Sequence, residues 1–97
     1  MEEFKLPNLF TVSGYKVYFW SNENDPLEPI HLHVAKGKPS QNATKIWITE
    51  SGRALAVNWK EDIAKGDRNN ILRMIEANSK YIVDKWYEQF GEISYYC

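Results

Sequence analysis

Both histidines of this 97-residue chain stand one residue apart, as His31 and His33, in the stretch EPIHLHVAKG. Two imidazoles on one face of a strand are an arrangement that many metal sites use, and here the third ligand of a divalent metal would be Glu28, Asp25 or Glu50. A hydrolase or ribonuclease built on the pair would use metal-bound water, or would use the two rings as general acid and base without a metal. The alternative is that the rings hydrogen-bond to backbone or stack on Trp and Tyr. We favour this alternative and expect no cofactor, because two ligands without a spaced third are a weak signal.

Length and composition predict one domain over residues 1–97, with 43% hydrophobic and 26% charged residues and a formal net charge of −1. This charge balance lacks the basic excess that holds nucleic-acid backbones. Cys97 is the single cysteine, so no internal disulfide forms. The start MEEFKLPNLF has no secretion-signal pattern, and no apolar run reaches the roughly 20 residues of a membrane helix. We therefore expect a cytoplasmic protein that does not enter a membrane.

Alternating hydrophobicity predicts strands over about residues 9–59. Ser13-Gly14 and Ser51-Gly52 are two-residue turn candidates, in which glycine supplies a positive φ. Short links between neighbouring strands favour an antiparallel meander of four or five strands.

A helical period follows over about residues 67–90. Asp67 is the expected N-cap, with its carboxylate accepting from backbone N–H groups, and Gly91 is the expected left-handed C-cap. The predicted fold class is α+β, with one long C-terminal helix packed on one face of the sheet.

Alternation also sorts the strand residues into two faces. One face is the predicted core face. It contains Ile30, Leu32 and Val34 of one strand and Leu55, Val57 and Trp59 of another. The second face carries aromatic, imidazole and ammonium groups, from Lys16, Tyr18, Trp20, His31, His33, Lys45 and Trp47. Contiguous exposed aromatic surface marks a contact with another molecule. In the alternative, loops 21–29 and 37–43 or the terminal ISYYC, which we expect to be docked, fold over this face.

The second face suggests two kinds of binding partner. Lys16 and Lys45 among Tyr18, Trp20 and Trp47 resemble a stacking platform for single-stranded nucleic acid. The glycine-aromatic signature of an RNA-recognition sheet is missing, however. A protein partner, or self-association, is therefore favoured over nucleic acid.

The order of these parts resembles a family of small bacterial proteins named domain of unknown function 4160. The resemblance rests on the hairpin GYKVYFWSN, a Pro-containing loop, the strand PIHLHV and a terminal helix with Trp86. Family members carry Pro-Pro-His-Phe-His where this chain reads Pro29-Ile30-His31-Leu32-His33, so one proline is absent. The resemblance implies a compact α+β domain and no particular reaction. It also implies a small protein partner, because genes of this family look like halves of two-gene modules of the toxin–antitoxin kind.

Three functions remain in order of preference. The first is a protein-interaction module, as one component of a toxin–antitoxin-like pair. The second is a small metal- or His-dependent hydrolase or ribonuclease centred on His31 and His33. The third is a single-stranded nucleic-acid binder. The residues favour a binding role over an enzyme.

Overall fold

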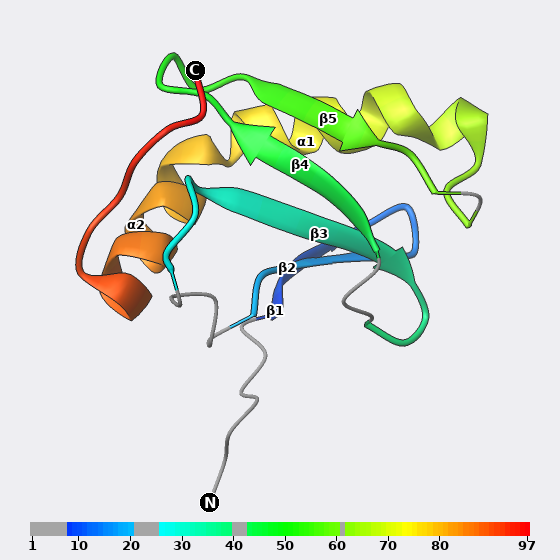
Figure 1. The fold of residues 1–97 in the computed structure, drawn as a ribbon. Coiled ribbons are helices and arrows are strands. Elements are labelled where there is room, and N and C mark those ends of the chain that lie inside the picture. The colour runs from blue at the N-terminus through cyan, green and yellow to red at the C-terminus, as the bar shows by residue number, and fades with distance from the viewer. Residues whose placement is uncertain (1–7, 21–25, 40–42, 61) are drawn as a thin grey trace, which may run out of the picture.

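The meander predicted from the alternation is present as a five-stranded sheet, in which each strand is antiparallel to the next (Figure 1). The structure is a computed structural model that describes residues 8–20, 26–39, 43–60 and 62–97. The strands are β1 (Asn8–Val12), β2 (Tyr15–Tyr18), β3 (His31–Lys36), β4 (Thr44–Ile48) and β5 (Ala54–Asn58). The helices are the 3-10 turn η1 (Lys65–Asp67), α1 (Arg68–Ala77) and α2 (Ser79–Phe90). The α+β fold class is thereby confirmed.

Both predicted turns join neighbouring strands, but only the first is a two-residue turn. Ser13 and Gly14 both have positive φ, at 51° and 84°, as a two-residue turn of type I′ requires. The turn pairs Val12 with Tyr15 and so joins β1 to β2. The second turn has three residues, 50–52, rather than the predicted two, because the Thr49 N–H donates to the Arg53 carbonyl at 2.9 Å. Gly52 has a φ of 87° in this loop, where a side chain would be strained.

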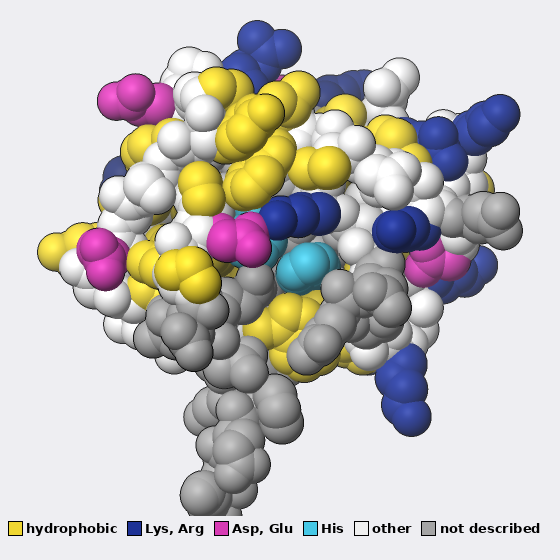
Figure 2. Space-filling view, in the orientation of Figure 1, with side chains coloured by type: hydrophobic (Ala, Val, Ile, Leu, Met, Phe, Trp, Pro, Cys, Tyr) yellow, Lys and Arg dark blue, Asp and Glu magenta, His cyan; other side chains and the backbone are white. Residues whose placement is uncertain are grey.

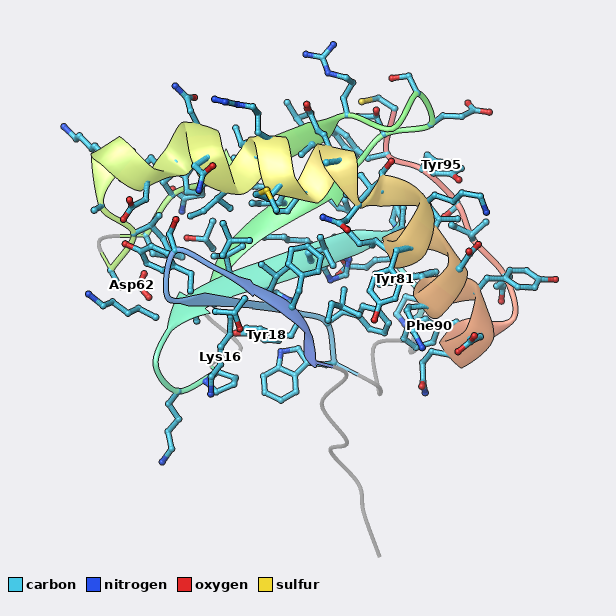
Figure 3. The ribbon with its side chains drawn as sticks, turned by 180° about the vertical axis from the view of Figure 1, so that it is seen from behind. Lys16, Tyr18, Asp62, Tyr81, Phe90 and Tyr95 are labelled. Carbon is cyan, nitrogen blue, oxygen red and sulfur yellow. The ribbon has the colours of Figure 1, made fainter. Side chains whose placement is uncertain are left out.

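Both helices lie on the same side of the sheet, as the view from behind shows (Figure 3). α1 packs against β5 and β1, whereas α2 covers the end of the sheet where β3 begins (Figure 1). The core between sheet and helices contains fully buried aliphatic and aromatic side chains, among them Val17, Phe19, Leu32, Val34, Ile46, Ile48, Ile71, Ile75, Ile82 and Trp86.

The predicted helical region is divided into two helices at Asn78. This residue leaves helical geometry, with φ −109° and ψ 17°, and its side-chain amide Nδ2 donates to the Met74 carbonyl at 2.8 Å. Asparagine favours such local side-chain bonds over a continuing helix. The break lets α2 turn toward the end of the sheet, where Trp86 packs against Phe19 with ring centroids 5.1 Å apart. Among the described residues, no helix is long and apolar enough to cross a membrane.

The assignment of Leu55 and Val57 to the core face is wrong. Leu55 pairs with Trp47, which lies on the second face, and the two β5 side chains are 44% and 52% exposed. Their neighbours Ala54 and Ala56 pack against the core instead. The small alanines are suited to this position because α1 packs closely over β5.

A β-bulge explains why Trp59 nevertheless packs against the core. Lys45 pairs with Asn58 while the next residue, Ile46, pairs with Ala56, so β5 contains one extra residue at this point. The extra residue reverses the alternation, and Trp59 returns to the core side. A strict period of two cannot reveal such a change of phase.

Asp67 stands at the N-cap position of α1, but its carboxylate makes no capping hydrogen bond. Its Oδ2 accepts from the Tyr15 hydroxyl at 2.9 Å instead. The same hydroxyl accepts from the Ala64 backbone N–H at 3.1 Å. Tyr15 therefore ties β2 to the segment that leads into the helix. The expected left-handed C-cap is present, since Gly91 has a φ of 75°.

Candidate binding face and histidine pair

The sheet register brings the central residues of the predicted second face together. Tyr18 of β2 pairs with His33 of β3, and His33 pairs with Lys45 of β4. One step further along, His31 pairs with Trp47. Directly opposed residues of antiparallel strands point to the same side of the sheet, so these five side chains form one continuous row. Lys16 and Trp20, two residues before and after Tyr18, extend it.

The row is held together by ring contacts. Tyr18 and His33 stack with centroids 5.6 Å apart and planes 28° apart, while Trp20 meets Tyr18 edge to face. His31 meets His33 edge to face at 5.2 Å and Trp47 at 5.8 Å. Aromatic pairs at such separations stabilise a fold beyond their buried area. The two histidines are therefore adjacent, as the spacing predicts, and both take part in aromatic packing.

His31 is a buried link between the sheet and α2. Its side chain is 1% exposed, and its ring lies edge to face with Trp86 at 5.4 Å. Its Nδ1 is 2.9 Å from the Pro29 carbonyl oxygen. A carbonyl only accepts, so Nδ1 carries the proton and, in the neutral ring, Nε2 is the basic nitrogen. Sequence reasoning placed Trp86 in the terminal helix but missed its contact with this histidine.

A salt bridge lies beside the histidines. Lys45 Nζ donates to Glu28 Oε1 at 2.6 Å and stands 4.4 Å from the centre of the Trp47 ring. The same Glu28 oxygen is 3.9 Å from His31 Nδ1. Figure 2 shows imidazole surface in a recess next to one acidic and one basic side chain.

The second face is less exposed than its composition suggests. Tyr18 and His31 are almost fully buried and His33 is 7% exposed, whereas Trp20 and Trp47 keep part of their surface. Loops 21–29 and 37–43, which were predicted as alternative covers of this face, lie partly outside the described residues.

The C-terminal segment, residues 91–97, is docked at this end of the sheet, as expected. Tyr96 stacks on Trp47 with centroids 4.7 Å apart and planes 5° apart. The Ile30 N–H donates to the Ser94 carbonyl at 2.9 Å, and the Glu50 N–H donates to the Cys97 carbonyl at 3.0 Å. The segment runs from the end of α2 to the turn between β4 and β5 (Figure 1).

An exposed apolar strip remains on the β4–β5 side of this face. It consists of Leu55, Val57 and Tyr96, which are 44%, 52% and 59% exposed, together with the partly buried Trp47. Trp47 connects the strip, because it pairs with Leu55 and stacks with Tyr96. Figure 2 shows apolar side chains gathered above the imidazole surface. Sequence reasoning missed Leu55 and Val57, because the three-residue loop between β4 and β5 shifts the strand pairing by one residue from that of the predicted two-residue turn.

The predicted metal ligands do not assemble into a set of three within the described part of the chain. Among the described residues, no three His, Cys, Asp or Glu side chains lie together so that they could hold an ion. Glu28 is the carboxylate beside His31, but its Oε1 is bonded to Lys45. Glu50 belongs to no such group in the described part of the chain, and Asp25 lies outside it.

Comparison with known proteins gives one kind of match. The family model described as Domain of unknown function (DUF4160) matches residues 14–87, from the first hairpin turn to the last part of α2. No curated protein and no solved structure matches the chain.

Proposed function

We propose that this chain, which belongs to the family described as Domain of unknown function (DUF4160), is a protein-interaction module that binds a small partner protein. The partner is the other member of a two-component pair of the toxin–antitoxin kind, as the family resemblance suggests. The contact surface is the apolar strip on the second face.

The exposed apolar strip carries this proposal. An antiparallel sheet that packs helices on one face ordinarily presents polar side chains to water on the other. Here Leu55, Val57 and Tyr96 are exposed side by side with Trp47. The strip includes β5, which ends the strand order of the sheet and so offers a partner both side chains and an edge.

The burial of the row argues for a protein rather than a nucleic acid. A nucleic-acid base needs an exposed ring face on which to stack. Tyr18 and His33 are buried, and their rings stack on each other. Lys45 is engaged by Glu28, and the net charge of the chain is −1. The cation that stands over the Trp47 ring is therefore already paired with a carboxylate.

A hydrolase centred on His31 and His33 is the second candidate. The observation that favours it is the hydrogen bond from His31 Nδ1 to the Pro29 carbonyl, because it fixes the tautomer in which Nε2 can accept a proton. The burial of His31 counts against direct access of a substrate. An RNA or ester substrate cleaved by the wild type and left intact by a folded His33→Gln variant would favour this candidate.

The interaction function is tested by purification of the tagged chain from its own cells at moderate salt. A stoichiometric partner identified by mass spectrometry would then be prepared separately and its affinity measured by calorimetry. Leu55→Lys and Val57→Lys are expected to weaken binding at least tenfold, because each places a charge in the apolar contact. Tyr87→Lys is the matched control, since Tyr87 is 57% exposed on α2 and outside the strip.

Two results would refute the proposal. In the first, the wild type retains no partner at a one-to-one ratio. In the second, a purified partner binds the Leu55→Lys variant as tightly as the wild type.

A further inference from the structure

We infer that the C-terminal segment occupies a peptide-docking site, and that a partner displaces it with an extended segment of its own. The docking site is formed by the backbone N–H groups of Ile30 and Glu50 and by the indole ring of Trp47. This inference rests on the proposed interaction function and adds to it the chemistry of the ligand.

The backbone contacts of the segment are those of a bound peptide. Its Ser94 and Cys97 carbonyls accept from Ile30 and Glu50, just before β3 and just after β4. Main-chain bonds of this kind are open to any extended chain and do not depend on its sequence. An extended segment of another protein can therefore make both hydrogen bonds in place of the C-terminal segment.

The side chains of the segment alternate between core and solvent. Ile93 and Tyr95 pack against the core, whereas Ser94 is exposed. Tyr96 points the other way and stacks on Trp47 while it remains 59% exposed. Alternation of this kind is the pattern by which a sheet recognises an extended ligand.

The site and its occupant differ in their relation to the family domain. The family match, residues 14–87, contains Ile30, Trp47 and Glu50 but ends before the docked segment. Gly91, in the left-handed conformation, ends α2 and separates the segment from the helix. The family match thus covers the residues of the docking site but not the segment that occupies it.

These contacts define the ligand that would replace the segment. It is an extended peptide with an apolar side chain at the place of Ile93, an aromatic one at the place of Tyr95, and a flat ring that stacks on Trp47. Trp47 also belongs to the apolar strip, because it pairs with Leu55. The strip and the docking site are therefore adjacent, and one partner protein can contact both.

The test uses the full chain and a fluorescent peptide of residues 91–97 that carries Cys97→Ser. In the wild type the attached segment competes at a high effective concentration. Tyr96→Ala removes the stacking that holds it, so the free peptide should bind this variant at least tenfold more tightly than the wild type. Tyr87→Ala, which alters an exposed tyrosine outside the site, should bind the peptide as the wild type does.

A second peptide tests the recognition itself. The peptide that carries Tyr96→Ala in addition should lose binding to the Tyr96→Ala protein. The inference is overturned if the folded Tyr96→Ala chain binds the intact peptide no better than the Tyr87→Ala chain.

Hydrogen exchange on the wild type keeps the inference testable if Tyr96→Ala fails to fold. The Ile30 and Glu50 amides should become exchangeable together, through an opening that requires less free energy than global unfolding. Exchange of both amides only through global unfolding would show that the segment is a fixed part of the fold.

The peptide-binding and hydrogen-exchange measurements need no partner protein. They therefore test the docking site separately from the proposed interaction function. Tyr96 itself belongs to the strip, so release of the segment by a partner is followed through a fluorophore on the exposed Cys97. A partner that binds the wild type while this fluorophore stays as immobile as in the free chain would refute the inference alone. Absence of any partner would remove the proposed function, whatever the peptide does.

Discussion

The imidazole of His31 meets the indole of Trp86 edge to face, with ring centroids 5.4 Å apart. One residue begins β3 and the other lies in α2, so this contact joins the sheet to the helix that covers its end. The histidine that attracts attention as a ligand or base is therefore also a packing residue.

Replacement of His31 should consequently lower stability. His31→Ala removes a buried ring and leaves the Pro29 carbonyl without its donor, and we expect a loss of about 2–4 kcal/mol. His31→Asn should lose ~1 kcal/mol less, because its amide nitrogen can take the position of Nδ1 and donate to Pro29. Urea denaturation measures both values, with the exposed Lys38→Ala as control. A cost of His31→Ala near that of the control would contradict the packing role.

Tyr15→Phe is expected to destabilise the fold by about 1–2 kcal/mol. The hydroxyl lost donates to Asp67 and accepts from the Ala64 N–H, so two further polar groups lose a partner. Thermal unfolding followed by circular dichroism measures the effect. Tyr87→Phe removes an exposed hydroxyl from α2 and should be neutral, so equal effects of the two changes would disprove a special role of Tyr15.

The stability of the protein should depend on pH through Glu76. The hydrogen bond from the Ala54 N–H lowers the pKa of Glu76 below its usual value. Desolvation by burial opposes this effect, and the hydrogen bond and charge of Arg53 lower the pKa by smaller amounts. A lowered folded-state pKa contributes stability above the unfolded-state pKa, and this contribution is lost as the pH falls through the folded-state pKa.

Glu76→Gln tests this dependence. The variant should be less stable than the wild type at pH 7, by ~1 kcal/mol, and the difference should vanish in acid. Denaturation midpoints between pH 7 and pH 2 would be compared with those of Glu88→Gln, whose exposed pair with Lys85 should contribute little. A difference that stays constant with pH would rule out ionisation of Glu76 as the cause.

Zinc should bind the wild type no more tightly than it binds His33→Ala. His31 Nδ1 holds its proton toward Pro29, and no set of three ligands is found among the described residues. Calorimetric titration of the two proteins at neutral pH checks this. Stoichiometric binding that His33→Ala abolishes would move the hydrolase ahead of the interaction module.

The sequence predicts those parts of the fold that depend on local patterns. The glycine turn at Gly14 and the alternation in β2, β3 and β4 give the sheet order and place His31 and His33 beside Trp47. The helix end at Gly91 is likewise local. Such features follow from φ preferences and from the period of a strand.

The remainder depends on contacts between distant parts of the chain. The three-residue loop 50–52 shows itself only in the pairing of Thr49 with Arg53, so the alternation alone assigns Leu55 to the wrong face. The carboxylate of Asp67 could accept a hydrogen bond either from the backbone at the start of α1 or from a distant hydroxyl. It accepts from the hydroxyl of Tyr15. Tyr96 reaches Trp47 because the segment after α2 runs back to the turn between β4 and β5, an arrangement of distant parts of the chain that no local pattern reveals (Figure 1).

The bond between Glu76 and the Ala54 N–H also protects against aggregation. β5 ends the sheet, and the exposed backbone groups of such a strand can recruit a strand from another molecule. The Glu76 carboxylate accepts from one of these backbone donors, the Ala54 N–H, which lies next to the exposed Leu55. Protonation in acid releases this donor, so fibrous or amorphous precipitation at low pH would begin along β5.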